Sequence, residues 1–136
     1  ICLDILKSIP DIPVLGICLG HQAVGYSCSG LINRLSIPVH GKVSNVNIIK
    51  KEKLFQNIPE KFSVMRYHSL YISENNFPEE LEILAKTDDG IIMAIKHKTK
   101  EIYGVQFHPE SYFTNYGKEI LKNFLSISYN QEEYSC

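Results

Sequence analysis

The sequence has no uninterrupted apolar run that approaches the roughly 18 residues needed to cross a membrane as a helix. It also lacks the opening of a secretory signal, in which a basic segment is followed by an apolar stretch and small residues. These two absences give no reason to expect a membrane partner. The expected setting is inside the cell, and a cytoplasmic or a plastid location would both fit.

An excess of charge of either sign is also missing. Fourteen Lys and Arg residues face fifteen Asp and Glu residues, for a formal net charge of −1. The basic residues are scattered along the chain and form no stripe that would follow a phosphate backbone. Nucleic acid is therefore not expected as a partner.

Cysteine is sparse, and its spacing is irregular. The four cysteines are Cys2, Cys18, Cys28 and Cys136, which form neither paired metal ligands nor a disulfide framework. We interpret them as free thiols. Because no C-x-x-C or H-E-x-x-H pattern occurs, no metal site is expected.

The composition is that of one globular domain. The 136 residues are 44% hydrophobic and 21% charged, which allows a single core, and no linker divides residues 1–136. The polar tail at residues 128–136 is expected to fray. Residues 1–9 have helical apolar spacing but no capping residue before them, and the chain begins with Ile1, so we expect further sequence upstream.

The order of apolar runs predicts an α/β fold. Residues 13–17 resemble a buried parallel strand, followed by a helix over residues 19–29 that would end at Gly30 in a left-handed turn. Short turns at residues 88–90 and 98–100 indicate an antiparallel meander. The expected strands are residues 31–35, 43–49, 62–67, 81–87, 91–97 and 102–107, and residues 120–125 mark one face of a closing helix. We therefore expect an open, mostly parallel sheet flanked by helices, with an antiparallel extension.

Cys18 lies where the first predicted strand meets the helix, between Gly16 and Gly20. This pattern is that of a nucleophile elbow, in which glycines remove side chains that would clash in a tight turn. The N-terminal dipole of the helix would favour the thiolate, and the amide of Leu19 could donate to an oxyanion. Alternatively, Cys18 is a small buried hydrophobic residue, and the elbow alone leaves these two interpretations about equal.

A second motif follows the last predicted strand. Pro109 favours an extended backbone at His108, and side chains two residues apart in an extended segment point the same way. Glu110 would then orient the imidazole of His108, which would act as the base for Cys18. Each of these groups follows a strand, where open α/β sheets place their sites.

Residues 16–22 (GICLGHQ) and 104–111 (GVQFHPES) resemble the signatures of class I, triad-type glutamine amidotransferases. Residues 40–42 (HGK) and 66–70 (RYHSL) resemble the glutaminase subunits of anthranilate synthase and of aminodeoxychorismate synthase. The resemblance extends from Ile1 to about Leu125 and implies a flavodoxin-like fold. The family's opening strands and its Gly-rich loop with a second oxyanion donor are absent from these 136 residues, so we expect this piece to be inactive and poorly stable alone.

The resemblance also implies a role for each matching residue. The catalytic triad would be Cys18, His108 and Glu110. The residues that match the glutamine-binding positions are Leu19, Gln22, Ser69 and Leu70. The residues that match the contact with a chorismate-using synthase, separate or fused, are His40, Gly41 and Lys42. No cofactor is implied for this domain, and Mg²⁺ is expected only in the synthase partner.

Several alternatives remain open at this point. The chain could be another triad hydrolase, such as a γ-glutamyl hydrolase, a different amidotransferase branch, or a non-catalytic docking module. The sequence does not choose between anthranilate and aminodeoxychorismate as the product. For His21 a structural role is favoured, whereas His68 either shapes the glutamine pocket or is a hydrogen-bonded loop residue.

Overall fold

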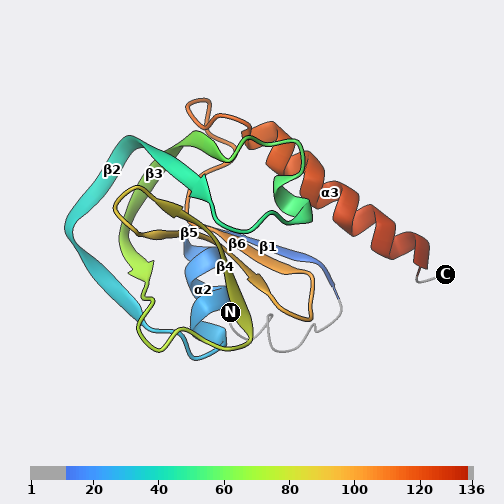
Figure 1. Cartoon of the computed structure of the whole chain (residues 1–136), viewed down its shortest axis with the longest axis horizontal. Helices are drawn as coiled ribbons and strands as arrows, with labels where there is room; N and C mark the ends of the chain where they lie inside the picture. Colours follow the sequence, from blue (N-terminus) through green and yellow to red (C-terminus); the bar gives the residue numbers. More distant parts are fainter. Residues whose placement is uncertain (1–11, 135–136) are drawn as a thin grey trace.

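The computed structural model describes residues 12–134 (Figure 1), so the helix predicted for residues 1–9 lies outside the described part. The elements in chain order are β1 (Val14–Ile17), α2 (Leu19–Ser27), β2 (Ile32–Ile48), the short 3₁₀ helix η1 (Lys53–Phe55), β3 (Lys61–Ile72), β4 (Leu81–Thr87), β5 (Ile92–His97), β6 (Ile102–Val105) and α3 (Gly117–Tyr134). Strand, helix and meander follow one another in the predicted order.

The six strands form one sheet in the order β1-β6-β5-β4-β2-β3. The pair β1/β6 is parallel, with Gly16 opposite Gly104, and the other four pairs are antiparallel. The α/β class and the antiparallel extension are thus confirmed. Among residues 12–134, however, parallel pairing is limited to β1/β6, because short turns connect β4 to β5 and β5 to β6 without crossover helices.

Helices cover both faces of the sheet, and each face has its own core. Val24 of α2 packs with Ile72, Ile92, Ile95 and neighbouring side chains. On the other face, Ile120 and Ile127 of α3 join a larger cluster that contains four aromatic side chains. Figure 1 shows the sheet curling where β2 and β3 sweep around beside α2. The two cores fix β1 and β6, which carry the residues of both predicted motifs.

The long strand β2 replaces the two shorter strands predicted at residues 31–35 and 43–49. Its pairing with β3 shifts register between His40 and Lys42, which is a bulge-like irregularity. Gly41 lies at this shift with φ of 70°, and a Cβ atom there would be 2.7 Å from the hydroxyl oxygen of Tyr67. The positive φ therefore favours glycine here, and a side chain would also require the exposed ring of Tyr67 to move.

The helix ends differ from the prediction in two places. The left-handed residue after α2 is Ser29, with φ of 69°, and not Gly30. The amide of Gly30 instead donates to the carbonyl of Gly25 at 2.9 Å. The absence of a side chain at residue 30 allows its backbone to lie this close to the backbone of α2. At the other end of the chain α3 continues to Tyr134, so much of the segment expected to fray is helical.

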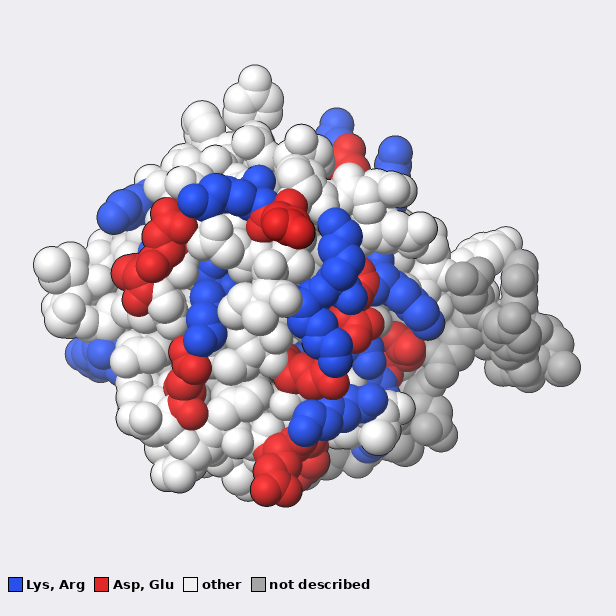
Figure 2. All heavy atoms as spheres, viewed as in Figure 1, with Lys and Arg blue, Asp and Glu red and all other residues white. Residues whose placement is uncertain are grey.

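The surface agrees with the balanced charge of the sequence. Figure 2 shows Lys and Arg interspersed with Asp and Glu across the viewed face, with no stripe of one sign. Among residues 12–134, four ion pairs join Lys and acidic side chains: Lys50–Glu82, Lys53–Glu101, Lys61–Asp88 and Lys86–Glu74. Within the described residues, no helix has the length and apolar character to cross a membrane.

Candidate active site

Cys18 occupies the junction between β1 and α2 with a strained backbone. Its φ is 54° and its ψ is −101°, and it forms the N-cap position of α2. The amide of Cys18 donates to the carbonyl of Val105 at 2.9 Å, which fastens the junction to β6. A non-glycine residue held at positive φ is typical of functional turns, and the strain projects the thiol from the end of the sheet.

The two glycines around Cys18 contribute unequally. A Cβ atom on Gly16 would lie 2.5 Å from the backbone of Gly20, so α2 can approach β1 only if residue 16 has no side chain. A Cβ atom on Gly20 would meet nothing within 4 Å. The prediction that the turn needs both glycines for space is therefore wrong for Gly20.

Burial dominates the electrostatics of the Cys18 thiol and raises its pKa above the ordinary value. The negative charge of Glu110 raises this pKa further, while hydrogen bonds from the Leu19 amide and from Gln106 lower it. The dipole of the helix N-terminus predicts a favoured thiolate, but the net shift is in the opposite direction. Cys18 is thus protonated at neutral pH, and an attack by its sulfur would require a base that removes its proton.

His108 has the partner that such a base needs. Its Nδ1 atom lies 2.7 Å from Oε1 of Glu110, so the predicted contact is confirmed. The backbone forms a turn, in which the amide of Ser111 donates to the carbonyl of His108 at 3.2 Å, where the sequence predicts an extended segment. In the tautomer with its proton on Nδ1, the imidazole donates to Glu110 and keeps a lone pair on Nε2.

Thr114 fixes the position of His108, although its sequence context gives no signal. Its hydroxyl donates to the carbonyl of His108 at 2.7 Å and accepts from the amide of Met65 at 3.0 Å. The amide of His108 donates to the carbonyl of Met65 at 3.3 Å. The turn that carries His108 and Glu110 is therefore tied to β3, and the side chain of Thr114 is almost fully buried.

A cavity of about 340 Å³ brings the predicted groups together. Cys18 and His108 both line it, and Glu110 lies behind His108. The other lining residues are Leu19, Gln22, Tyr67, His68, Ser69 and Leu70, which include all four predicted glutamine-binding residues. Residues separated by up to 90 positions in the sequence thus surround one space that is adjacent to the thiol.

A chain of amide hydrogen bonds supports this cavity from behind. The side-chain nitrogen of Gln22 donates to the carbonyl of Leu70 at 3.1 Å and to the side-chain oxygen of Gln106 at 3.2 Å. Gln106 in turn donates to the sulfur of Cys18 at 3.7 Å. Gln106 is fully buried and is not among the predicted site residues, since its side chain could equally have faced the core.

His68 combines the two roles that the sequence left open. It lines the cavity, and its Nδ1 atom lies 2.8 Å from the carbonyl of Leu70 while its Nε2 accepts from Nε of Arg66 at 3.0 Å. Burial lowers the pKa of His68, so the ring is neutral at pH 7. It belongs to β3 and to no loop, and its hydrogen bonds hold the backbone of Leu70 at the cavity wall.

His21 is fully buried and does not line the cavity. Burial lowers its pKa to about 3, so it stays neutral at any pH at which the protein would work. The ring packs against Gly104, where a Cβ atom would come within 2.7 Å of Nδ1. This placement supports the structural role that was favoured for His21.

The residues predicted to meet a synthase lie beside this cavity. His40 pairs with Tyr67 across β2 and β3, and both residues are exposed. The ring of Tyr67 makes an edge contact with His108, with centroids 6.1 Å apart and planes at 81°. The bulge at residues 40–42 is thus one residue layer away from the predicted catalytic imidazole.

A second cluster of reactive side chains lies elsewhere, where potential ligand atoms of Cys28, Glu80 and His97 fall within 4.8 Å of one another. The Nδ1 atom of His97 accepts from the amides of Thr99 and Lys100, each at 3.2 Å. Ligation through Nδ1 would break these two bonds, and in the neutral ring Nε2 carries a proton that a metal would have to displace. We therefore infer no metal site from this cluster.

Comparison with known proteins connects this geometry to a family. Residues 2–127 match the family model of the class I glutamine amidotransferases. Anthranilate synthase component 2 of Pyropia yezoensis is 48% identical over 130 residues, which cover 94% of this chain and 68% of that protein. The bifunctional protein TrpGD of Thermotoga maritima is 44% identical over 128 residues, which cover 93% of this chain and 22% of that protein.

A solved structure has a similar fold. A Thermoplasma acidophilum protein described as a candidate subunit of GMP synthase superposes with a TM-score of 0.84 at 30% identity, covering 90% of this chain and 60% of that chain. This chain spans about two thirds of the length of its component 2 relatives, with 68%, 67% and 64% covered in three of them. With the family model matching nearly its whole length, the chain belongs to the class I glutamine amidotransferases.

Proposed function

We propose that the protein is a glutaminase subunit or domain that hydrolyses L-glutamine and supplies the ammonia to a chorismate-using synthase. The observation that carries this proposal is the cavity in which Cys18 and His108 meet the predicted glutamine-binding residues, with Glu110 hydrogen-bonded to His108. The family membership and the component 2 relatives support the same assignment.

The first half of the reaction forms a thioester. Nε2 of His108 takes the proton of the Cys18 thiol while the sulfur attacks the side-chain carboxamide carbon of glutamine. The oxyanion that forms accepts a hydrogen bond from the amide of Leu19, the donor that already acts on the sulfur. The C–N bond then breaks, and His108 returns the proton to the leaving nitrogen, so ammonia and a γ-glutamyl thioester result.

The second half regenerates the thiol. His108 takes a proton from water, and the resulting hydroxide attacks the thioester carbon. The C–S bond breaks, glutamate leaves, and the proton returns to Cys18. Throughout, Glu110 keeps Nδ1 of His108 protonated and stabilises the imidazolium. The sum is glutamine plus water giving glutamate plus ammonia, and it needs no cofactor in this domain.

The walls of the cavity provide for recognition of the substrate. Ser69 and Leu70 line one part of the cavity, and Gln22 lines another. Because Gln22 also holds the carbonyl of Leu70, a change at Gln22 would disturb both walls together. We assign the amino-acid end of glutamine to these residues and its carboxamide to the space between Cys18 and His108.

The partner would dock over the bulge of β2. His40 and Lys42 are exposed there, and Gly41 lies against Tyr67, whose ring contacts His108. Ammonia released beside His108 would therefore emerge close to this surface. Anthranilate is the product that the component 2 relatives favour, and aminodeoxychorismate is the alternative product of the same chemistry.

The experiment measures glutamate release from glutamine by the full-length protein with and without a chorismate-using synthase. We expect release to rise with the partner and to disappear in Cys18→Ser, whereas Cys28→Ser retains it. If the native protein binds the synthase but releases no glutamate in either condition, the chain is a docking module and the catalytic assignment is wrong. Release that is insensitive to the partner, and inhibited by γ-glutamyl peptides, would indicate a γ-glutamyl hydrolase.

A further inference from the structure

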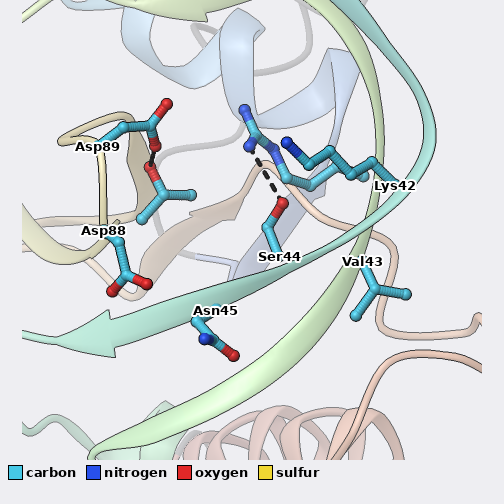
Figure 3. Close-up of a pocket in the computed structure, with 8 residues that line it drawn as sticks. Lys42, Val43, Ser44, Asn45, Asp88 and Asp89 are labelled. Atoms are coloured by element: carbon cyan, nitrogen blue, oxygen red, sulfur yellow. Dashed lines mark hydrogen bonds between the residues drawn. The ribbon is translucent and has the colours of Figure 1, made fainter.

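A second hollow, of about 330 Å³, lies between β2, β3 and the turn after β4 (Figure 3). Its lining is almost entirely polar: Lys42, Val43, Ser44, Asn45, Arg66, Thr87, Asp88 and Asp89. Neither Cys18 nor His108 belongs to it, so it is distinct from the glutamine cavity. Figure 3 shows Lys42 and Ser44 on one wall and Asp88 and Asp89 on the opposite wall.

The positive wall contains a buried guanidinium. Arg66 is only 4% exposed, and within residues 12–134 neither Arg66 nor Lys42 takes part in an ion pair. Arg66 uses Nε to bond His68 and Nη1 to bond the hydroxyl of Ser44 at 3.3 Å. The remaining N–H groups of its fork are left for another acceptor. A carboxylate is the group that a guanidinium fork binds with two parallel hydrogen bonds.

The two carboxylates of the negative wall differ in their partners. Asp88 accepts from the side chain of Asn47 at 2.8 Å and pairs with Lys61 at 3.5 Å. Asp89 accepts only from the hydroxyl of Thr87 among the described side chains, and this bond lowers the pKa of its carboxyl. Asp89 is therefore an ionised, exposed carboxylate that is not paired with a cation in the described part of the chain.

The two walls carry opposite charges, which interact through space without forming an ion pair. The charge of Arg66 acts on the carboxyl of Asp89, yet no ion pair joins them across the hollow. A ligand that completes both walls must place a negative group at Arg66 and Lys42 and a positive group at Asp89. Val43 is the only apolar residue of the lining, so the ligand meets mainly polar side chains, although their carbon atoms also face the hollow.

We propose that this hollow binds a free α-amino acid as its zwitterion, with the carboxylate on Arg66, Lys42 and Ser44 and the ammonium on Asp89. The volume lies at the small end for ligand sites, which suits a single amino acid with a small or polar side chain. This site takes no part in the chemistry at Cys18, although Lys42 also belongs to the surface proposed for the synthase. Because Arg66 also holds His68, an occupant of the hollow would lie one hydrogen bond from the wall of the glutamine cavity.

The test measures binding of glycine and of L-serine to the protein by isothermal titration calorimetry. Neither probe has the carboxamide that Cys18 would attack. Glycine methyl ester lacks the carboxylate, and N-acetylglycine lacks the ammonium. Two variants at the rim of the hollow, Asp89→Asn and Lys42→Gln, remove one charge each from exposed positions and so leave the core intact. Glu119→Gln on α3 removes the same charge as the first variant far from the hollow.

We expect glycine or L-serine to bind the native protein and Glu119→Gln equally, and to bind each rim variant at least about tenfold more weakly. The ester and the acetylated probe should not bind. Failure of both probes to bind, or equal binding by the rim variants, would overturn the proposal. Equal binding of N-acetylglycine would also overturn it, since the hollow would then be a simple anion site. None of these probes carries the carboxamide that Cys18 would attack, so the outcomes test the hollow and not the proposed function.

Discussion

Nδ1 of His108 lies 2.7 Å from Oε1 of Glu110, two residues further along the chain. Glu110 has two opposite effects on the deprotonation of Cys18. In the proposed reaction Glu110 orients the base that deprotonates Cys18, but its negative charge also raises the pKa of the thiol. Replacing the carboxylate of Glu110 by an amide should therefore separate its effect on the orientation of the His108 imidazole from its effect on the pKa of the Cys18 thiol.

In Glu110→Gln we expect glutamate release to fall by on the order of 10²-fold or more, because the imidazole loses the acceptor that fixes its tautomer. We expect the thiol to become more acidic, since a negative charge close to it is removed. Iodoacetamide alkylates the thiolate, so the midpoint of its pH profile should move to lower pH. A fall in turnover with a midpoint moved to higher pH would contradict this assignment of Glu110.

Gln106 should have the opposite effect to Glu110 on the pKa of the Cys18 thiol. Its hydrogen bond to the sulfur lowers the pKa of the thiol, so Gln106→Met should move the alkylation midpoint to higher pH. The change also removes an acceptor from Gln22, which should cost about 1 kcal/mol in the free energy of unfolding. The pH profile of alkylation, recorded beside that of Glu110→Gln, checks the sign. An unchanged midpoint would show that this amide does not stabilise the thiolate.

The elbow offers a matched pair of glycine variants. A Cβ atom on Gly16 would lie 2.5 Å from the backbone of Gly20, so Gly16→Ala should destabilise the fold by about 1–3 kcal/mol. Gly20→Ala adds its Cβ in open space within α2, and there the higher helix propensity of alanine should leave stability unchanged or slightly raised. Urea unfolding midpoints measure both. Equal losses in the two variants would contradict the packing of α2 against β1.

His21 should make stability depend on pH. Its folded pKa of about 3 lies below the ordinary value of 6.5, so below pH 6.5 the unfolded chain binds a proton that the folded chain does not. Stability is fully present above pH 6.5 and should be lost at up to about 1.4 kcal/mol per unit as the pH falls toward 5.

Urea unfolding of His21→Leu at pH 7 and pH 5 tests this expectation. The variant should lose less stability between the two values than the native protein, whatever its stability at pH 7. His40→Gln serves as the control, because His40 is exposed on β2. If the native protein and His21→Leu lose equal amounts, the buried histidine is not the source of the acid sensitivity.

The parts of the site that could be predicted from sequence are those encoded by local patterns. Cys18 could be placed because an apolar strand, two glycines and a helix follow one another within a few residues. His108 and Glu110 could be paired because only two positions separate them, even though the chain reaches this contact through a turn. The α/β class followed from the same alternation of apolar runs.

The parts that escaped prediction depend on strand register. Thr114 meets His108, and Gln106 meets Cys18, only because β1, β3 and β6 are aligned as they are. The bulge at Gly41 has no signature in the apolar pattern, which therefore predicts two strands where the chain forms one. The charged hollow is likewise lined by residues of β2, β3 and the turn after β4, and no local sequence pattern predicts it.

The nucleophilic role of Cys18 is tested most directly by labelling with a diazoketone analogue of glutamine. The protein would be treated with the analogue in the presence of the synthase, digested and analysed by peptide mass spectrometry, with and without excess glutamine. Cys28 provides an internal control, because it is also a partly exposed free thiol. We predict that the label attaches to Cys18, is suppressed by glutamine and is absent from Cys28. Glutamate release that persists while Cys18 remains unlabelled, or a label on Cys28 that glutamine does not suppress, would contradict the assignment of Cys18 as the nucleophile.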